Sequence, residues 1–365
     1  MDWYGRHGYV AGASAALLAG LLLLAAALFG GCGGEASEAQ ARPFGAPPSP
    51  APGVRAWAAG EVGTLLVTAD GGATWKRQRF YLSERGVDVA FPDAETGWLA
   101  TDAGAVLLTV DGGGGWKVVE KASVQIKALA ATDALHAWVV ATTVPAAGGA
   151  GTAVVLRTDN GGATWARTGF GDAMLADVAF ADARSGVLVA LDRIWTTRDG
   201  GRSWKLRRRL GLTVLTSAFA GDARHAWVAG WDTQDGLPVV VTTQDGGVSW
   251  RRLDVDVPAP PSGDLQAKQI VAAGDLTGGA HLWLTCNAGV LASTDGGRTW
   301  VLQQVPAGQP QAVGAADARH LIATTTGQPV LATADGGQTW LAFGRDGFLR
   351  RPLVAVAAVA TPVGE

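Results

Sequence analysis

Aspartates that recur at near-regular intervals are the side chains of this 365-residue chain that could do chemistry. Glycoside hydrolysis needs only two carboxyl groups at a suitable separation. The aspartates belong to an eight-residue motif, T/S-x-D-G-G-x-T/S-W, which occurs seven times. Its third positions are Asp70, Asp111, Asn160, Asp199, Asp245, Asp295 and Asp335, and its last positions are Trp75, Trp116, Trp165, Trp204, Trp250, Trp300 and Trp340. Successive tryptophans lie 41, 49, 39, 46, 50 and 40 residues apart, which is the period of a repeat architecture.

The motif itself predicts a tight turn between two strands. Gly-Gly after Asp supplies the positive φ angles of a hairpin turn, and a short carboxylate accepts hydrogen bonds from its own turn. Hydroxyls such as those of Thr68 and Thr74 can bond within the same loop. An apolar or β-branched run precedes each motif, and the tryptophan opens another extended stretch. We therefore expect each motif to form a structural hairpin tip, with its aspartate occupied by the turn.

Two further strands are predicted upstream of each hairpin. In the second repeat they cover residues 86–91 and 98–101. Four antiparallel strands in about 40 to 45 residues are typical of a propeller blade. The sequence thus predicts an all-β, seven-bladed β-propeller over residues 54–365.

The first repeat lacks one strand. Pro-rich sequence precedes Arg55, and proline cannot donate the ladder hydrogen bonds of an inner strand. After the seventh hairpin, the segment Leu353 to Ala360 reads LVAVAAVA and has no repeat of its own. We expect this C-terminal strand to close the ring by completing the first blade, burying Leu353, Val354, Val356 and Val359.

Tryptophan is abundant, with 15 residues in the chain. Seven are motif positions, and five more recur on the predicted second strand, namely Trp57, Trp98, Trp138, Trp227 and Trp283. Repetition at equivalent positions favours a role in packing over a sugar-stacking platform.

These residues carry a family resemblance. The pattern T-x-D-G-G-x-T-W is that of the Asp-box, or BNR repeat, and WAAGEVGTLLVTADGGATW and GWLATDAGAVLLTVDGGGGW resemble the photosystem II stability/assembly factor family of seven-bladed propellers. The resemblance covers about Arg55 to Ala360 and implies a non-enzymatic assembly factor with an arginine-rich face. The same repeat occurs in sialidases, xyloglucan-degrading hydrolases and sorting receptors. A carbohydrate-active glycoside hydrolase or lectin of the Asp-box propeller type is therefore the alternative.

The residues available for catalysis favour the hypothesis of a non-enzymatic protein. Sialidases use a Tyr nucleophile with Glu and three Arg, whereas Tyr81 is the one tyrosine after the leader. Xyloglucan-degrading relatives use a cleft between two propellers, and this chain has one. Outside the leader, the histidines occupy equivalent turns of different repeats and cannot converge on one metal or triad; they are His136, His225, His281 and His320. We expect no catalytic residue, no metal and no cofactor.

Basic residues gather on the predicted outer strands and the loops that leave them. We expect a docking face for an acidic partner or a lipid headgroup, formed by Arg207, Arg208, Arg209, Arg350 and Arg351. The alternative is that edge strands carry cations to block edge-to-edge pairing. The net charge of −3 gives no reason to expect nucleic acid as a partner.

The N-terminal region predicts export. Residues 1–31 read as a signal peptide or membrane anchor, because an apolar run of 20 residues, from Val10 to Phe29, follows a short segment containing Arg6. Small residues before Cys32 resemble a bacterial lipoprotein cleavage site, so we expect lipidation there; an uncleaved anchor and simple secretion are the alternatives. All three place the propeller on the extracytoplasmic side of the cell envelope, where its expected partner is a protein of an envelope or membrane complex.

Residues 32–53 form a Pro/Ala/Gly-rich linker. The second cysteine, Cys286, is expected to be a buried thiol, and a disulfide with Cys32 is the less favoured alternative because lipidation would consume that partner.

Overall fold

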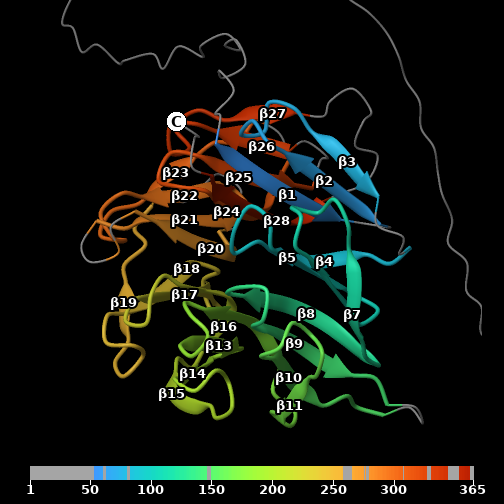
Figure 1. Cartoon of the computed structure of the whole chain (residues 1–365). Helices are drawn as coiled ribbons and strands as arrows, with labels where there is room; N and C mark the ends of the chain where they lie inside the picture. The colour runs from blue at the N-terminus through green and yellow to red at the C-terminus, as the bar shows by residue number, and fades with distance from the viewer. Residues whose placement is uncertain are drawn as a thin grey trace, which may run out of the picture. The chain divides into compact units, whose positions relative to one another are not determined.

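The computed structural model describes residues 53–361 except 61–62, 80–82, 146–148, 258–264, 275, 277–278, 307, 327–329 and 344–352. The described residues form 28 strands in seven four-stranded antiparallel sheets, which follow one another around a ring (Figure 1). The predicted seven-bladed propeller is confirmed. The leader 1–31, Cys32 and nearly all of the linker lie outside the described residues and stay predictions. In the described part, no helix is long and apolar enough to cross a membrane.

In each blade the strands follow one another from the innermost to the outermost. Blade 1 consists of β28 (Leu353–Ala360), β1 (Val54–Gly60), β2 (Thr64–Thr68) and β3 (Lys76–Arg79). Blade 2 consists of β4 (Gly86–Ala90), β5 (Gly97–Thr101), β6 (Ala105–Thr109) and β7 (Lys117–Lys121). Blade 3 consists of β8 (Val124–Ala131), β9 (Ala137–Thr143), β10 (Ala153–Thr158) and β11 (Ala166–Gly169). Blade 4 consists of β12 (Leu175–Phe180), β13 (Gly186–Ala190), β14 (Arg193–Thr197) and β15 (Lys205–Arg209).

The remaining blades follow the same order. Blade 5 consists of β16 (Thr213–Ala220), β17 (Ala226–Asp232), β18 (Pro238–Thr243) and β19 (Arg251–Leu253). Blade 6 consists of β20 (Ala267–Ala273), β21 (His281–Cys286), β22 (Gly289–Ser293) and β23 (Val301–Gln303). Blade 7 consists of β24 (Pro310–Ala315), β25 (Leu321–Thr325), β26 (Val330–Thr333) and β27 (Leu341–Phe343).

The C-terminal strand closes the ring, as predicted. β28 pairs antiparallel with β1, from Val54↔Ala360 to Gly60↔Leu353, so the first and last strands of the described part share one blade (Figure 1). Leu353 and Val356 are buried, whereas Val354 is only partly buried. Val359 is partly buried as well, so the strand contributes less apolar burial than its sequence suggests.

The core lies between neighbouring blades. Most second and third strands are buried on both faces, as β18 is, whereas β14 is buried only at alternate positions near its start and outer strands such as β7 are largely exposed. One cluster joins Trp98 and Val106 of blade 2 to Val139 of blade 3. The ring is therefore held together by blade-to-blade contacts.

The tryptophans pack as the repeat predicted. Trp57 stacks on Phe91 of the next blade with ring centroids 3.5 Å apart, and Trp138 stacks on Phe180 at the same distance. The motif residue Trp204 then meets Phe180 edge-on. These tryptophan rings contact aromatic side chains of the protein, which confirms their predicted role in packing.

Cys286 is buried, as expected. Its thiol donates to the carbonyl of Gly289 at 3.4 Å. Cys32, the partner in the alternative disulfide, lies outside the described residues.

Candidate functional site

The carboxylate of the motif aspartate accepts several hydrogen bonds from its own turn. In the first copy, Asp70 Oδ1 accepts hydrogen bonds from Thr68 Oγ1 at 2.7 Å and from Thr74 N at 2.8 Å. Its other oxygen accepts from Thr74 Oγ1 at 2.6 Å. Thr68 Oγ1 in turn accepts from the backbone N–H of Gly72 at 2.9 Å. Both carboxylate oxygens therefore accept hydrogen bonds within the turn.

The same bonds recur around the ring and set the ionisation of the carboxylates. The hydroxyl and backbone N–H of Ser249 hold the pKa of Asp245 well below its usual range. Burial alone would raise the pKa of Asp199, but hydrogen bonds from Ser203 and Thr197 lower it to about 2. These groups are therefore ionised at neutral pH and contribute stability that is lost in acid, as the pH falls through their lowered pKa.

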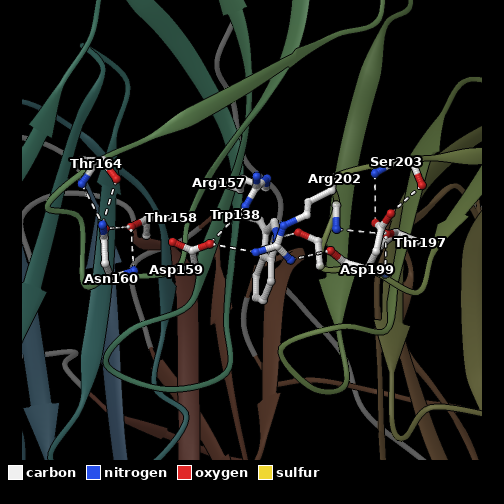
Figure 2. A network of polar contacts seen from close by, with 12 residues as sticks. Trp138, Arg157, Thr158, Asp159, Asn160, Thr164, Thr197, Asp199, Arg202 and Ser203 are labelled. Carbon is white, nitrogen blue, oxygen red and sulfur yellow. Dashed lines mark hydrogen bonds and ion pairs between the residues drawn. The ribbon is translucent and has the colours of Figure 1, made fainter.

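The third motif shows that the charge itself is dispensable. Asn160 Oδ1 accepts from Thr158 Oγ1 at 2.9 Å, and its Nδ2 donates to Thr164 Oγ1 at 2.8 Å (Figure 2). An amide thus forms the same turn as a carboxylate. This tolerance is expected of a folding device and not of a catalytic acid.

At three junctions the motif loop also binds the preceding blade. Gly200 and Gly201 have φ angles of 73° and 79°, which favour glycine in the turn. The N–H of Gly200 donates to the carbonyl of Arg184 in the same blade at 2.9 Å. Its carbonyl accepts the indole N–H of Trp138, from the preceding blade, at 2.8 Å. Trp57 and Trp283 make the equivalent bond at two other junctions.

An ion pair joins the motif loops of blades 3 and 4. Asp159 Oδ2 lies 3.0 Å from Arg202 Nη2 and 3.4 Å from Arg157 Nη1 (Figure 2). Arg202 Nη1 also donates to the carbonyl of Asp199 at 2.9 Å. Exposed pairs of this kind contribute little stability, roughly 0 to 1 kcal/mol. Arg202 therefore has partners within the protein and is not the side chain on which we base a binding site.

A groove at the next junction is different. It has a volume of about 760 Å³ and lies at the motif end of blades 4 and 5. Its walls come from the first turn of each blade and from the two motif loops, and its lining comprises Asp182, Ala183, Arg184, Ser185, Arg198, Ala223, Arg224 and Asp245. We call this surface the junction groove. Three exposed arginines from two blades therefore share one concave surface.

The carboxylates of the junction groove accept hydrogen bonds from their own turns, whereas none of its three arginines has an ion-pair partner among the described residues. Asp182 Oδ1 accepts the backbone N–H of Arg184 at 2.7 Å and that of Ser185 at 2.8 Å. Arg198 Nη2 donates to the carbonyl of Asp245 at 3.0 Å, which fixes its guanidinium at the junction. Among the described residues, no carboxylate lies within ion-pair distance of Arg184 or Arg224. Guanidinium groups presented in this way suit carboxylates or phosphates, which they bind in a bidentate manner.

The arginines predicted as a docking face lie elsewhere on blade 4. Arg207, Arg208 and Arg209 are on the outermost strand β15. Arg207 Nε donates to Thr196 Oγ1 at 2.8 Å, and the other two are exposed. Arg350 and Arg351 lie outside the described residues, so the proposed meeting of the two groups stays a prediction.

Sequence reasoning missed the junction groove. Its signal was present in the repeat, because Arg184 and Arg224 occupy the same position in the turn before the second strand of adjacent blades. Arg198 occupies the second position of the intervening motif. Aligning the blades by register would have placed the three side chains together.

Three of the four predicted histidines stay within their own turns, whereas His281 is the first residue of the strand β21. His136 Nδ1 lies 2.9 Å from Asp133, His225 Nδ1 lies 2.8 Å from Asp222, and His320 makes the same contact with Asp317. Over the part of the chain that the structure describes, no three metal-ligating side chains gather in a cluster. Tyr81 lies outside that part.

Several solved structures of different proteins are similar in fold to this chain. No family model and no curated protein matches the sequence. The structure is similar to YCF48 bound to D1 peptide, with a TM-score of 0.51, 17% identity and coverage of 71% of this chain and 81% of that one. YCF48 from Cyanidioschyzon merolae gives a TM-score of 0.56, 19% identity and coverage of 76% and 90%.

The GH74 xyloglucanase from Xanthomonas campestris is also similar in fold. It gives a TM-score of 0.55 and 20% identity over 80% of this chain, but the match covers only 47% of the enzyme. The chain therefore spans about half the length of this hydrolase. At these identities the similarities establish the propeller fold.

Proposed function

We propose that the chain is a non-enzymatic propeller, tethered to the membrane on its extracytoplasmic side, that binds a protein partner and assists assembly of an envelope or membrane complex. The junction groove carries this proposal, because Arg184 and Arg224 present cationic groups without ion-pair partners on a rigid frame. An acidic segment of a partner protein has the matching chemistry. The fold similarity to YCF48, whose structure with a D1 peptide is known, supports a peptide-sized ligand.

The membrane part of the proposal is supported by the sequence of the N-terminus. The apolar run in residues 1–31 and Cys32 suit a lipoprotein leader or an anchor, and residues 32–53 suit a tether. A tethered ring would search for its partner within the membrane layer, which raises the effective concentration of the two proteins.

A glycoside hydrolase or lectin is the second candidate. The observation that favours it is the fold similarity to the GH74 xyloglucanase. The motif carboxylates, which recur most regularly, are held by their own turns, as at Asp70 and Asp245. Turnover of a chromogenic xyloglucan fragment, or specific binding on a glycan array, would establish this candidate over the assembly factor.

Co-purification from crosslinked native membranes tests the proposal. The variant Arg184→Glu with Arg224→Glu reverses the two cations but leaves Arg198 and its bond to blade 5. We expect recovery of the partner to fall roughly tenfold or more, since a reversed charge at a complementary interface costs several kcal/mol. Thermal melting should stay close to that of the wild type, because both side chains are exposed.

The matched control is Arg208→Glu with Arg209→Glu on β15, which changes the net charge by the same amount. We expect this variant to retain the partner. Loss of the partner in the control, with retention in the groove variant, would instead assign binding to the outer strand with Arg207, Arg208 and Arg209.

A further inference from the structure

One position recurs in every innermost strand of the ring. Near the start of each of these strands the pairing register shifts by one residue. The residue that resumes pairing after the shift is equivalent in all seven blades; in order from blade 1 these residues are Ala355, Asp88, Ala128, Asp177, Ser217, Gln269 and Ala312. Innermost strands surround the central channel of a propeller, so this position forms a ring around the channel.

Polar side chains at this position tie the blade to the next one. Asp88 Oδ2 accepts the backbone N–H of Leu129 at 2.8 Å, and Asp177 Oδ2 accepts that of Ala218 at 2.9 Å. Gln269 Oε1 makes the same bond to Val313 N at 2.7 Å. Ser217 Oγ accepts the N–H of Ile270 at 3.3 Å.

Neutral and ionisable side chains therefore form the same hydrogen bond to the next blade. The bond needs only an oxygen acceptor, which Gln269 and Ser217 supply without charge. Asp88 and Asp177 add an ionisable proton at two of the four junctions. The carboxyl groups can therefore also bind a proton, and the hydrogen bond between the blades does not require this ability.

The surroundings of the two carboxyls disfavour their ionised forms. Burial and, to a lesser extent, the negative charge of Asp177 raise the pKa of Asp88 to about 7, although the N–H groups of Leu129 and Val89 oppose the rise. Burial also raises the pKa of Asp177 to about 6, although the N–H groups of Ala218 and Val178 oppose the rise. The strand β8 packs against both β4 and β12, so the two side chains flank the same blade.

Few other charges lie on the strands that pack against these carboxyls. β4 packs against β1, β5, β8 and β28, and β12 packs against β8, β9, β13 and β16. Of these seven strands, only β1 and β8 carry charged residues, Arg55 and Lys127. Arg55 Nη1 donates to the carbonyl of Ala94, and Lys127 is exposed.

We propose that Asp88 and Asp177 form a proton-binding pair in the wall of the central channel, which makes the ring sensitive to pH near neutrality. The native ring holds protons that the unfolded chain releases, because an unfolded aspartate titrates at its ordinary acidic value. The free energy of unfolding therefore falls as the pH rises through the neutral range. This pH dependence of stability is independent of the partner site, and we expect it even if the junction groove binds nothing.

Urea unfolding of the full chain in detergent, followed by tryptophan fluorescence, tests the proposal. From about pH 5 to about pH 8 we expect the unfolding equilibrium constant to rise about 100-fold through Asp88 and about tenfold through Asp177. The variants Asp88→Gln and Asp177→Gln copy Gln269 at the same register, and each should remove its own share. Asp172→Gln, at an exposed aspartate, is the control and should keep the wild-type dependence.

An equilibrium constant that is equal at both pH values in the wild type would overturn the proposal, as would a wild-type dependence in the double Gln variant. If the Gln variants do not fold, the native wild type still decides the question. The infrared band of protonated carboxyl groups should be present at about pH 5 and lost by about pH 8. Absence of the band at the lower pH would contradict the proton-binding pair.

Discussion

Deleting Leu353–Ala360 is expected to unfold the entire propeller. The strand β28 supplies the innermost strand of blade 1 and pairs with β1 from Val54 to Gly60. Burial of Leu353 and Val356 contributes about 1.5 to 3 kcal/mol each. The deletion also exposes Ala56 and Ala58, which are fully buried, and frees one edge of β1. A typical domain is stable by only about 5 to 15 kcal/mol, so a ring opened in this way should not persist.

Circular dichroism and calorimetry measure this effect. The truncated chain should give no cooperative melting transition and no near-ultraviolet tryptophan signal. Removal of Pro362–Glu365, the residues after Thr361, is the matched control and should leave melting unchanged. Cooperative melting of the strand deletion near the wild-type temperature would contradict closure by β28.

Trp138→Ala is expected to cost about 3 to 5 kcal/mol of unfolding free energy. Trp138 is 1% exposed, stacks on Phe180 and donates its indole N–H to the carbonyl of Gly200. The substitution removes a large side chain from the contact between blades 3 and 4 and opens a cavity there. Denaturant unfolding at neutral pH measures the loss.

Trp195→Ala provides the comparison for Trp138→Ala. Trp195 lies on β14 of blade 4, is only partly buried and has the guanidinium of Arg193 over its ring. Its truncation should cost clearly less than that of Trp138. Equal losses in the two variants would contradict the view that second-strand tryptophans hold neighbouring blades together.

The fold could be predicted because its information is local and repeated. Each motif combines an Asp, two glycines and flanking hydroxyls, and these residues determine a turn without help from distant segments, as at Asp70. Counting the motifs gave the number of blades. The orphan strand Leu353–Ala360 could be assigned to blade 1 because that repeat lacked an innermost strand.

The candidate binding surface and the proposed proton-binding pair could not be predicted in the same way, because they arise where blades meet. Arg184 and Arg224 are far apart in sequence and share a groove only because blades 4 and 5 are neighbours. Asp88 and Asp177 look like ordinary strand residues until the register shift shows that they are equivalent. The partial burial of Val354 and Val359 likewise depends on the neighbouring strands, and an apolar pattern alone suggested full burial.

The most direct test of partner binding at the junction groove is site-specific photocrosslinking in native membranes. A photoreactive residue replaces Ala223, an exposed residue that lines the groove, or Val301, which is 65% exposed on β23 of blade 6. We predict a discrete crosslinked protein from position 223 and none from position 301. Crosslinks of equal yield from both positions, or from position 301 alone, would contradict binding at the groove.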